Sequence, residues 1–361
     1  MNLELDDERI ALRDTVRRFL AERASIAGHV RPMLDDPTGT TDAVWSGLAD
    51  LGATGVLVPA ELGGAGMTMV DAGIVAEELG AALHPGPWLS TAVAATRLLT
   101  ATGGQAGADI LTAIADGTCT VAVAGLAEQT ERPRVSARNG AFSVCSAPVA
   151  TPDAAAADLL LVFDGTALFA VRADDTGVSV TAEPGIDPTR KHFRVAFADA
   201  GAQRLGALSP DDVQAVTEDV LIAAAADALG AASAVMHMAI EYAKTRSQFG
   251  APIGSFQAVQ HLCVDMFETV ELARSGVIHA LWAAGNSPGE RQLATIRAKA
   301  FAGRLATVGD TAIQVFGGIG YTWEHDAHLY LKRLLSWSSL HGGPDRYLTE
   351  VGARLAKKAQ R

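Results

Sequence analysis

The feature that most constrains the fold of this chain is a block of short β-branched segments enclosed by long helical ones. Strand-like runs between Cys119 and Gly206 cover residues 120–124, 142–144, 159–163, 167–171, 178–181 and 192–197. Turn pairs such as Asn139-Gly140 and Asp164-Gly165 separate some of these runs. On both sides of the block, apolar residues recur at helical spacing. The sequence therefore predicts a mainly α fold with a central β domain.

Helical periodicity defines the segment before this block. The expected helices cover residues 6–23, 41–51, 70–79 and 93–115. In the first of them, Ile10, Val16 and Leu20 recur among charged residues, which is the pattern of an amphipathic helix. A break in the last helix is expected at Gly103-Gly104, because glycine is a poor helix former. These helices predict an N-terminal helical domain.

Long helices also follow the block. We expect them over residues 213–246, from 255 to beyond 266, 287–316 and 324–340. Gly250 and Pro252 are expected to end the first helix. Ser255 is predicted to cap the second, and Ser287 with Glu290 to form a capping box at the start of the third. The predicted domains are a helical domain, a β domain and a four-helix bundle, over residues 1–118, 119–208 and 209–361.

Charge and composition disfavour several classes of protein. The chain has 29 basic and 41 acidic residues, a net charge of −12, which repels nucleic acid. Apolar runs are interrupted by charges before they reach the roughly 18 residues that a membrane span needs. The first eight residues lack the features of a secretory signal, so a cytoplasmic location is expected. The three separated cysteines indicate neither disulfides nor a zinc site.

The end of the first long C-terminal helix carries a set of side chains that suits a dinucleotide. Arg246 offers a permanent cation, Phe249 an aromatic face, and Gln248 and Gln257 amides. A guanidinium can pair with a pyrophosphate, and a ring can cover an adenine or flavin. A solvated arginine at a helix end and a core phenylalanine would explain the same residues without a ligand.

A second candidate segment is Gln314-Val315-Phe316-Gly317-Gly318. It pairs an amide with consecutive glycines, which let a ligand or another backbone approach closely because they lack a Cβ. The segment does not follow a strand and does not have the GxGxxG spacing, so it does not indicate a Rossmann site. A helix end followed by a turn is the alternative interpretation.

Three sequence runs together resemble landmarks of the acyl-CoA dehydrogenase family. They are VPAELGGAGMTMVDAGIVAEELG, RSQFGAPIGSFQ and QVFGGIGYTWEHDAHLYLKR, in that family's order and spacing. The resemblance implies a helical domain, a β domain and a four-helix bundle that assemble into tetramers, with FAD at a subunit interface. It also implies that the residues gripping a neighbour's FAD are Arg246, Gln248, Phe249, Gln257, Gln314, Phe316, Gly317 and Gly318.

The chain departs from the family pattern where the flavin ring and the substrate are held. Members of the family carry a segment like TEPxxGSD, and this chain has Ala127-Glu128-Gln129-Thr130-Glu131 in its place. The next family landmark is a strand whose aromatic residue covers the flavin. The matching residues here, 146–152, contain no aromatic side chain. The resemblance therefore implies that this half of the cofactor site is reduced.

The catalytic base expected from the resemblance is also missing. The family reaction needs a carboxylate that removes the α-proton of an acyl thioester. In many members this glutamate precedes a glycine, and the matching residue is His341, before Gly342. In other members it lies on the first bundle helix, and the matching residue is Val220, beside Glu218 and Asp219. His341 and Glu218 are the remaining candidate bases.

We weigh three functions on these grounds. The first is a non-catalytic subunit that completes the FAD site of a paralogous acyl-CoA dehydrogenase subunit, resembling pairs from actinobacterial steroid-side-chain degradation. The second is a self-sufficient homo-oligomeric dehydrogenase that uses Glu218 or His341. The third is a structural relative without enzyme activity. The family also implies an acceptor like electron-transfer flavoprotein. No metal site is expected, because His325 and His328 have no third ligand at compatible spacing.

Overall fold

The structure, a computed structural model, describes residues 5–126, 132–138 and 140–359. The chain forms two compact units. The sheet unit contains Asp14–Ala72 and Pro85–Val220, and the bundle unit contains the described residues of Met1–Arg13, Gly73–His84 and Leu221–Arg361. The division into units falls within three helices, so it does not follow simple sequence boundaries. The three-domain division made from the sequence stays a prediction.

The N-terminal helices lie close to their predicted positions. They are α1 (Asp7–Arg23), α2 (Asp42–Asp50), α3 (Met69–Ala81), α4 (Thr96–Thr102) and α5 (Gln105–Ala115). The Thr41 hydroxyl caps α2 by accepting a hydrogen bond from the Val44 amide at 3.4 Å. The expected break after α4 is confirmed, because Gly103 ends this helix with a φ of 63°.

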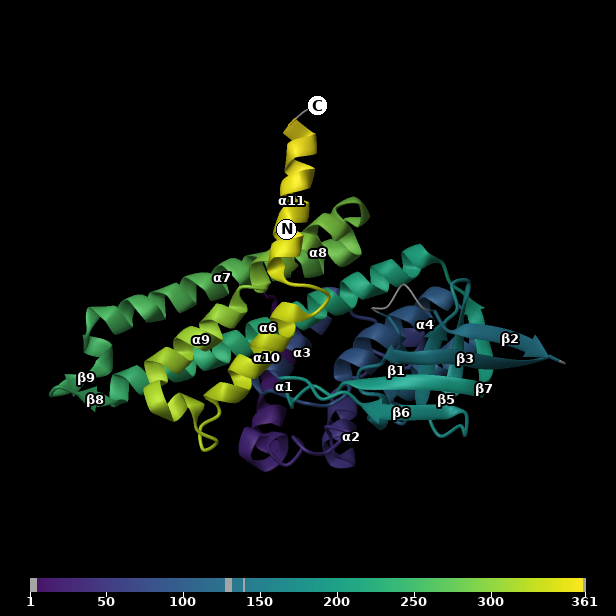
Figure 1. Ribbon diagram of the computed structural model, residues 1–361, viewed down its shortest axis with the longest axis horizontal. Coiled ribbons are helices and arrows are strands. Elements are labelled where there is room, and N and C mark those ends of the chain that lie inside the picture. The colour runs from purple at the N-terminus through teal and green to yellow at the C-terminus, as the bar shows by residue number, and fades with distance from the viewer. Residues whose placement is uncertain (1–4, 127–131, 139, 360–361) are drawn as a thin grey trace. The chain divides into compact units, whose positions relative to one another are not determined.

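The described residues of the sheet unit form a mixed seven-stranded sheet (Figure 1). Its strands are β1 (Val121–Ala124), β2 (Arg134–Arg138), β3 (Ala141–Ala150), β4 (Leu159–Phe163), β5 (Ala167–Arg172), β6 (Val178–Ala182) and β7 (Phe193–Ala207). The order is β1-β4-β5-β7-β3-β2, with β6 also paired to β7. Only the pairing of β1 with β4 is parallel among these strands.

The two faces of the sheet bury separate apolar clusters, as the alternation of strand side chains requires. Leu161 and Leu205 face a cluster that includes Leu98 of α4 and Ile114 of α5. Leu160 and the other residues of opposite parity face a second cluster built mainly from strands. All six predicted strands are present. The sequence does not predict strand β2, because four of its five residues are polar or alanine and most of them are exposed.

The bundle unit contains the second part of α6 (Pro210–Thr245) and five further helices among the described residues. These are α7 (Gln257–Asn286), α8 (Pro288–Ala302), α9 (Leu305–Phe316), α10 (Ala327–Ser339) and α11 (Pro344–Ala359). The prediction of one helix over residues 287–316 is wrong. The helix is interrupted at Gly303, where a Cβ would lie 2.7 Å from the Cβ of Pro344 and 2.9 Å from the carbonyl oxygen of Lys299.

Two predicted helix caps are also wrong in detail. The Ser255 hydroxyl donates to the Pro252 carbonyl at 2.7 Å, and α7 begins after Phe256 without a side-chain cap. Ser287 does occupy the N-cap of α8, with Pro288 in the first turn, but its side chain makes no capping hydrogen bond. The fixed φ of proline is enough to favour a helix start at this position.

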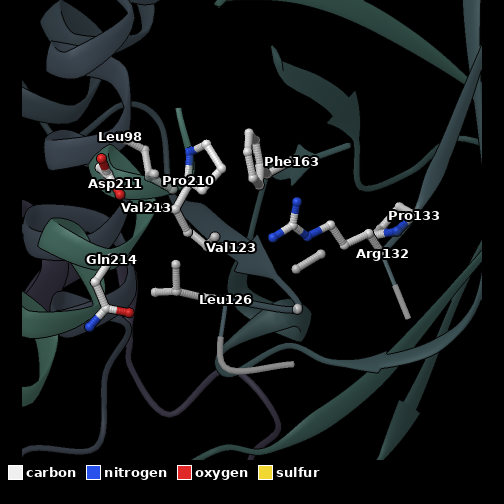
Figure 2. Close-up of a pocket in the computed structure, with 12 residues that line it drawn as sticks. Leu98, Val123, Leu126, Arg132, Pro133, Phe163, Pro210, Asp211, Val213 and Gln214 are labelled. Atoms are coloured by element: carbon white, nitrogen blue, oxygen red, sulfur yellow. The ribbon is translucent and has the colours of Figure 1, made fainter. Parts of the chain in front are cut away.

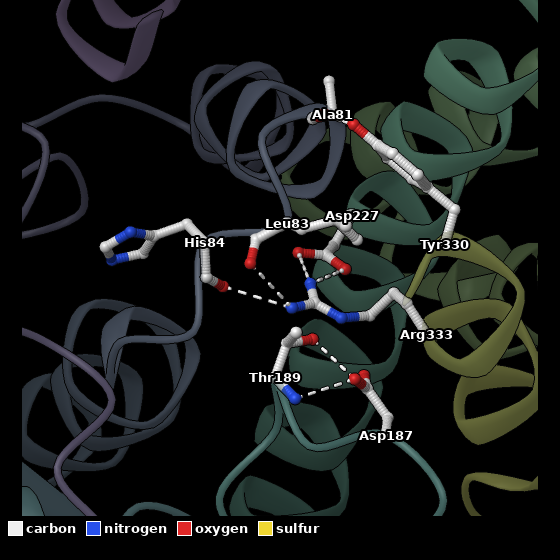
Figure 3. A network of polar contacts seen from close by, with 8 residues as sticks. All are labelled: Ala81, Leu83, His84, Asp187, Thr189, Asp227, Tyr330 and Arg333. Carbon is white, nitrogen blue, oxygen red and sulfur yellow. Dashed lines mark hydrogen bonds and ion pairs between the residues drawn. The ribbon is translucent and has the colours of Figure 1, made fainter. Parts of the chain in front are cut away.

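A buried ion pair joins three segments of the bundle unit (Figure 3). Nη1 of Arg333, on α10, donates to both carboxylate oxygens of Asp227, on α6, at 2.9 and 3.1 Å. Nη2 of Arg333 donates to the carbonyl oxygens of Leu83 and His84 at 3.3 and 3.2 Å. The Tyr330 hydroxyl donates to the Ala81 carbonyl at 2.7 Å. The chain following α3 is thereby fixed to α6 and α10.

Helix α6 is the one described helix that is long and apolar enough to cross a membrane by length and composition. Its most apolar 18-residue window has a mean hydropathy of 1.6, and 78% of that window is buried within the structure. Core helices of this length give the same signal.

Candidate functional site

The predicted cofactor residues at the end of α6 lie on an exposed hairpin. Strands β8 (Ser247–Gln248) and β9 (Ala251–Pro252) pair here, and Figure 1 shows them at one end of α7. The Arg246 amide continues the helix by donating to Tyr242, and the Arg246 carbonyl accepts from the amide of Ile253 at 2.7 Å. Arg246 is exposed, so its guanidinium is accessible to a ligand.

Phe249 is the most unusual side chain of this hairpin. It is 93% exposed and has a φ of 53°, a backbone conformation that is uncommon for residues other than glycine. Its ring centroid lies 6.2 Å from that of Phe256, in an edge-to-face arrangement. A phenylalanine this exposed does not belong to the core, so the alternative interpretation of Phe249 as a packing residue is not supported by its position.

The second candidate segment lies at the C-terminal end of α9 and is linked to the end of α6. The Phe316 ring is 4% exposed and packs 5.1 Å from the Tyr242 ring and 4.4 Å from the His325 ring, measured between centroids. Phe316 therefore packs inside, while Gln314 and the following glycines are exposed. Gly317 has a φ of 64°, and a Cβ on Gly317 or Gly318 would meet nothing within 4 Å.

These positions give one end of the bundle unit the properties that a dinucleotide requires. The exposed groups that gather there are a guanidinium, an aromatic ring, amides and an open glycine backbone. The guanidinium and amides can bind phosphate and polar ring edges, and the glycines allow close approach of the backbone. The residues present therefore fit the adenosine and pyrophosphate of FAD. The exposed members of the set are Arg246, Gln248, Phe249, Gln257, Gln314, Gly317 and Gly318.

His341 lies in the loop between α10 and α11, with a φ of 54°. Its carbonyl accepts hydrogen bonds from Nη1 of Arg346 at 3.2 Å and from the Tyr347 hydroxyl at 2.9 Å. Burial, followed by the positive charges of Lys299 and Arg346, lowers the pKa of the His341 imidazole. The ring is therefore neutral near pH 7 and lacks the negative charge of the carboxylate that the family reaction uses.

A buried lysine fixes the end of α10 next to this loop. Nζ of Lys299 donates to the carbonyl oxygens of Trp337 at 2.5 Å and Ser338 at 3.3 Å. It also lies 3.7 Å from the Trp337 ring centroid, and Nε1 of Trp337 donates to the Ala302 carbonyl at 2.9 Å. Burial lowers the pKa of Lys299 to about 7. These contacts tie α8 to the last turn of α10, where His341 follows.

The second candidate base, Glu218, lies in the first part of α6 within the sheet unit. Its Oε1 accepts a hydrogen bond from Nε2 of Gln214 at 3.1 Å, and its side chain is buried. The adjacent Asp219 is fully buried and accepts from Nε of Arg97 at 2.8 Å. Each carboxylate is thus engaged by a side chain of the same unit.

A cavity of about 250 Å³ lies within the sheet unit, beside the first turn of α6 (Figure 2). Its apolar lining includes Leu98, Val123, Leu126, Phe163 and Val213, and its polar lining includes Arg132, Asp211 and Gln214. The sequence alone does not indicate this cavity, because its lining residues come from four segments that are far apart in the chain. The only local signal was the Ser209 and Asp212 capping box, in which the Asp212 amide donates to the Ser209 hydroxyl at 3.1 Å.

The two segments of the half-site that the sequence predicts to be reduced differ in whether the structure describes them. The segment 127–131 lies outside the described residues. Residues 146–150 belong to β3, which pairs with β7 in the interior of the sheet order.

The described residues contain no group of three or more His, Cys, Asp or Glu side chains that could hold a metal ion. The centroid of the His328 ring lies 4.7 Å from that of the Trp323 ring.

Comparison with known proteins establishes the class. A family profile described as the acyl-CoA dehydrogenase N-terminal domain matches residues 6–118, and one described as the C-terminal domain matches residues 221–356. The chain belongs to the acyl-CoA dehydrogenase family. The resemblance found in the sequence and the mainly α fold with a central sheet are both confirmed.

Individual relatives cover nearly the whole chain. The acyl-CoA dehydrogenase IpdE2 of Mycobacterium tuberculosis is 35% identical over 353 residues, which is 96% of each chain. IpdE2 of Mycolicibacterium smegmatis is 32% identical and covers 97% of this chain and 100% of its own. A solved structure described as a Tcur3481-Tcur3483 steroid ACAD variant is 27% identical, with a TM-score of 0.86 over 98% of this chain and 99% of its own.

Proposed function

We propose that this chain is the non-catalytic subunit of a hetero-oligomeric acyl-CoA dehydrogenase and completes the FAD site of a paralogous subunit. The complex would desaturate the α,β bond of an acyl-CoA thioester and pass electrons to an acceptor like electron-transfer flavoprotein. The solved relative described as a steroid ACAD supports a steroid-derived acyl group for the complex. A cytoplasmic location is part of the same proposal.

The observation that carries this proposal is the exposure of Phe249 beside a set of accessible cofactor-binding groups. An aromatic side chain that is 93% exposed gains stability only when another surface covers it. Arg246 and the Gly317-Gly318 turn lie at the same end of the bundle unit and are exposed. This combination favours a ligand that is enclosed by a second chain.

His341 is poorly suited to act as the catalytic base. Bound flavin would accept the hydride that leaves the β-carbon of the acyl group. Removal of the α-proton needs a base, and the pKa of His341 is lowered by burial and by nearby positive charges. The lowered pKa makes this imidazole a weaker base than an ordinary histidine, and the neutral ring lacks the negative charge of a carboxylate. The chain's own residues therefore support binding of the cofactor better than they support the proton transfer.

The proposal is tested by co-expressing the chain with a paralogous subunit that carries the glutamate and measuring bound FAD. Arg246→Ala should lower the FAD affinity of the complex by about tenfold, because one charge-assisted contact with the pyrophosphate is lost. Lys244→Ala is the matched control, since Lys244 is exposed on the same helix and pairs with Glu241 at 2.6 Å. Equal FAD affinities in the two variants would contradict the proposal.

The alternative of a self-sufficient homo-oligomer makes a different prediction for the chain alone. Purified without a partner, it would bind FAD stoichiometrically and the flavin would bleach with acyl-CoA. Glu218 or His341 would be the base, and Glu218→Gln or His341→Ala would abolish the bleaching. If the chain binds no flavin either alone or with a paralogous subunit, the structural relative without enzyme activity is the remaining function.

A further inference from the structure

Three ring side chains join the two segments of the bundle unit that carry the predicted cofactor residues. Tyr242 lies one turn before Arg246 on α6, and the Arg246 amide donates to the Tyr242 carbonyl at 2.8 Å. Phe316 directly precedes Gly317 at the end of α9. The centroid of the Phe316 ring lies 5.1 Å from that of Tyr242 and 4.4 Å from that of His325. Phe316 is therefore the central member of a ring stack formed by these three side chains.

Phe316 is also the side chain on which the glycine turn of residues 317–320 folds. Its ring is buried, and a Cβ on Gly320 would lie 3.1 Å from the Phe316 Cβ. The Gly317 amide donates to the Ile313 carbonyl, so it belongs to the last turn of α9. Because packed interiors transmit displacements, a shift of the Phe316 ring would move the backbone of Gly317 and Gly318. Phe316 thus supports the turn from the interior.

His325 contacts its surroundings through its ring and through a ring nitrogen. The ring packs on Phe316, and Nδ1 accepts a hydrogen bond from the Ala327 amide at 3.1 Å. Ala327 is the first residue of α10, so this bond provides an acceptor for one amide of the helix start. The same bond fixes the direction of the imidazole against Phe316. His325 follows the glycine turn and is not one of the predicted cofactor residues.

We propose that His325 is a positioning residue that holds the glycine turn in place relative to Arg246. Its ring keeps Phe316 against Tyr242, and this contact fixes the end of α9 to the end of α6. Groups that bind one ligand have to be held within about 0.5 Å of their productive positions, which two independently moving helix ends cannot provide. The inference rests on the proposed function for the identity of the ligand, FAD, and adds a residue that acts on its binding through Phe316.

Two substitutions separate the ring contact of His325 from its hydrogen bond. His325→Phe keeps an aromatic ring against Phe316 and removes the acceptor for the Ala327 amide. His325→Asn keeps a side-chain oxygen that can accept from this amide and removes the ring. A residue that only stabilises the fold would act alike in both variants. A positioning residue should affect the glycine turn in His325→Asn and not in His325→Phe.

The first measurement is amide hydrogen exchange in the full chain without FAD or a partner. In His325→Asn the Gly317 amide should exchange about fivefold faster, because the ring contact with Phe316 is lost. In His325→Phe the exchange of the Gly317 amide should stay within about twofold of the unaltered chain, whereas the Ala327 amide should exchange faster. If His325→Phe does not fold, the Gly317 amide of His325→Asn decides.

The second measurement is the FAD affinity of the complex with a glutamate-carrying paralogous subunit, determined by titration of flavin fluorescence. His325→Asn should weaken FAD binding about fivefold, and His325→Phe should keep the affinity within about twofold. His279→Asn is the matched control, because the His279 ring also packs on an aromatic side chain, that of Trp282, at 6.4 Å between centroids. His279 lies about 33 Å along α7 from Gln257, at a rise of 1.5 Å per residue. This variant should change neither measurement.

Either of two results would overturn the inference. One is a Gly317 amide that exchanges in His325→Asn as it does in the unaltered chain, and the other is an equal loss of FAD affinity in His325→Asn and His325→Phe. If Arg246→Ala weakens FAD binding and His325→Asn does not, the inference fails and the proposed function stands. If the complex binds no FAD while the Gly317 amide responds as expected, the proposed function fails and the positioning of the turn by His325 is supported.

Discussion

At the scale of single residues, the buried Arg333 illustrates how one side chain can fix several segments. Its guanidinium makes hydrogen bonds to the Asp227 carboxylate and to two backbone carbonyls, and both charged side chains are at most 5% exposed. The planar, five-donor geometry of arginine allows these contacts at the same time, whereas lysine offers one nitrogen. The pair therefore defines one register of α10 against α6.

Removing one partner of this pair should be costly. Asp227→Ala leaves Arg333 buried without its carboxylate, so we expect a loss of about 3–5 kcal/mol in the free energy of unfolding. Urea denaturation followed by circular dichroism measures this loss. Asp265→Ala, at an exposed position of α7, is the control and should change stability by less than about 0.5 kcal/mol. A loss below about 1 kcal/mol for Asp227→Ala would mean that the ion pair is not formed in solution.

The lowered pKa of Lys299 predicts that the free energy of unfolding depends on pH. Its pKa is about 7 in the folded chain because of burial, compared with an ordinary value of 10.5. Between these values the unfolded chain binds more protons than the folded chain, so stability should rise with pH across this window. Relative to Lys299→Met, the unaltered chain should gain up to about 1.4 kcal/mol per pH unit between pH 8 and 9. A stability difference that stays constant over this interval would contradict the lowered pKa.

At the scale of elements, close contact between α3 and α6 in the bundle unit depends on two glycines. A Cβ on Gly80 would lie 1.9 Å from the Asp227 carbonyl oxygen, and a Cβ on Gly230 would lie 1.8 Å from the Glu77 carbonyl oxygen. Such distances leave no room for a methyl group, and the obstructing atoms are backbone. The helices can approach this closely only because each supplies a glycine at the crossing.

A methyl group at this crossing should separate the helices. Gly230→Ala is expected to destabilise the chain by more than about 2 kcal/mol, even though alanine is the better helix former. Gly352→Ala, in α11, is the matched control, because a Cβ there meets nothing within 4 Å. That variant should be neutral or more stable by about 0.5–1 kcal/mol. Thermal unfolding of both variants gives the comparison, and equal melting temperatures would exclude a tight crossing.

Several elements could be predicted from the sequence because the signals are local. The predicted run 159–163 coincides with β4, since five consecutive apolar residues precede an Asp-Gly turn. The interruption at Gly303 could not be predicted, because it depends on contact with Pro344, far along the chain. The cavity could not be predicted for the same reason, because its lining residues come from segments that are far apart in the sequence. The residues proposed to bind FAD could be selected from the sequence because each family motif is contiguous in it.

At the scale of the whole molecule, a substitution at Phe249 should affect the proposed complex but not the stability of the isolated chain. Because its ring is already 93% exposed, Phe249→Ser should change the melting temperature of the isolated chain by less than about 2 °C. In a complex with a paralogous subunit, the same change should weaken FAD retention on gel filtration. Phe256→Ser, which alters the neighbouring and less exposed ring, is the comparison. A large loss of melting temperature for Phe249→Ser would show that the ring packs within its own chain.

The exposed hairpin also bears on how a cell would have to produce this protein. Under the proposed pairing, a chain synthesised without its partner keeps an exposed phenylalanine side chain at the hairpin tip. Exposed aromatic side chains favour nonspecific association and binding by chaperones and proteases. Matched synthesis of the two chains would therefore be as important for a useful yield as the folding of either one.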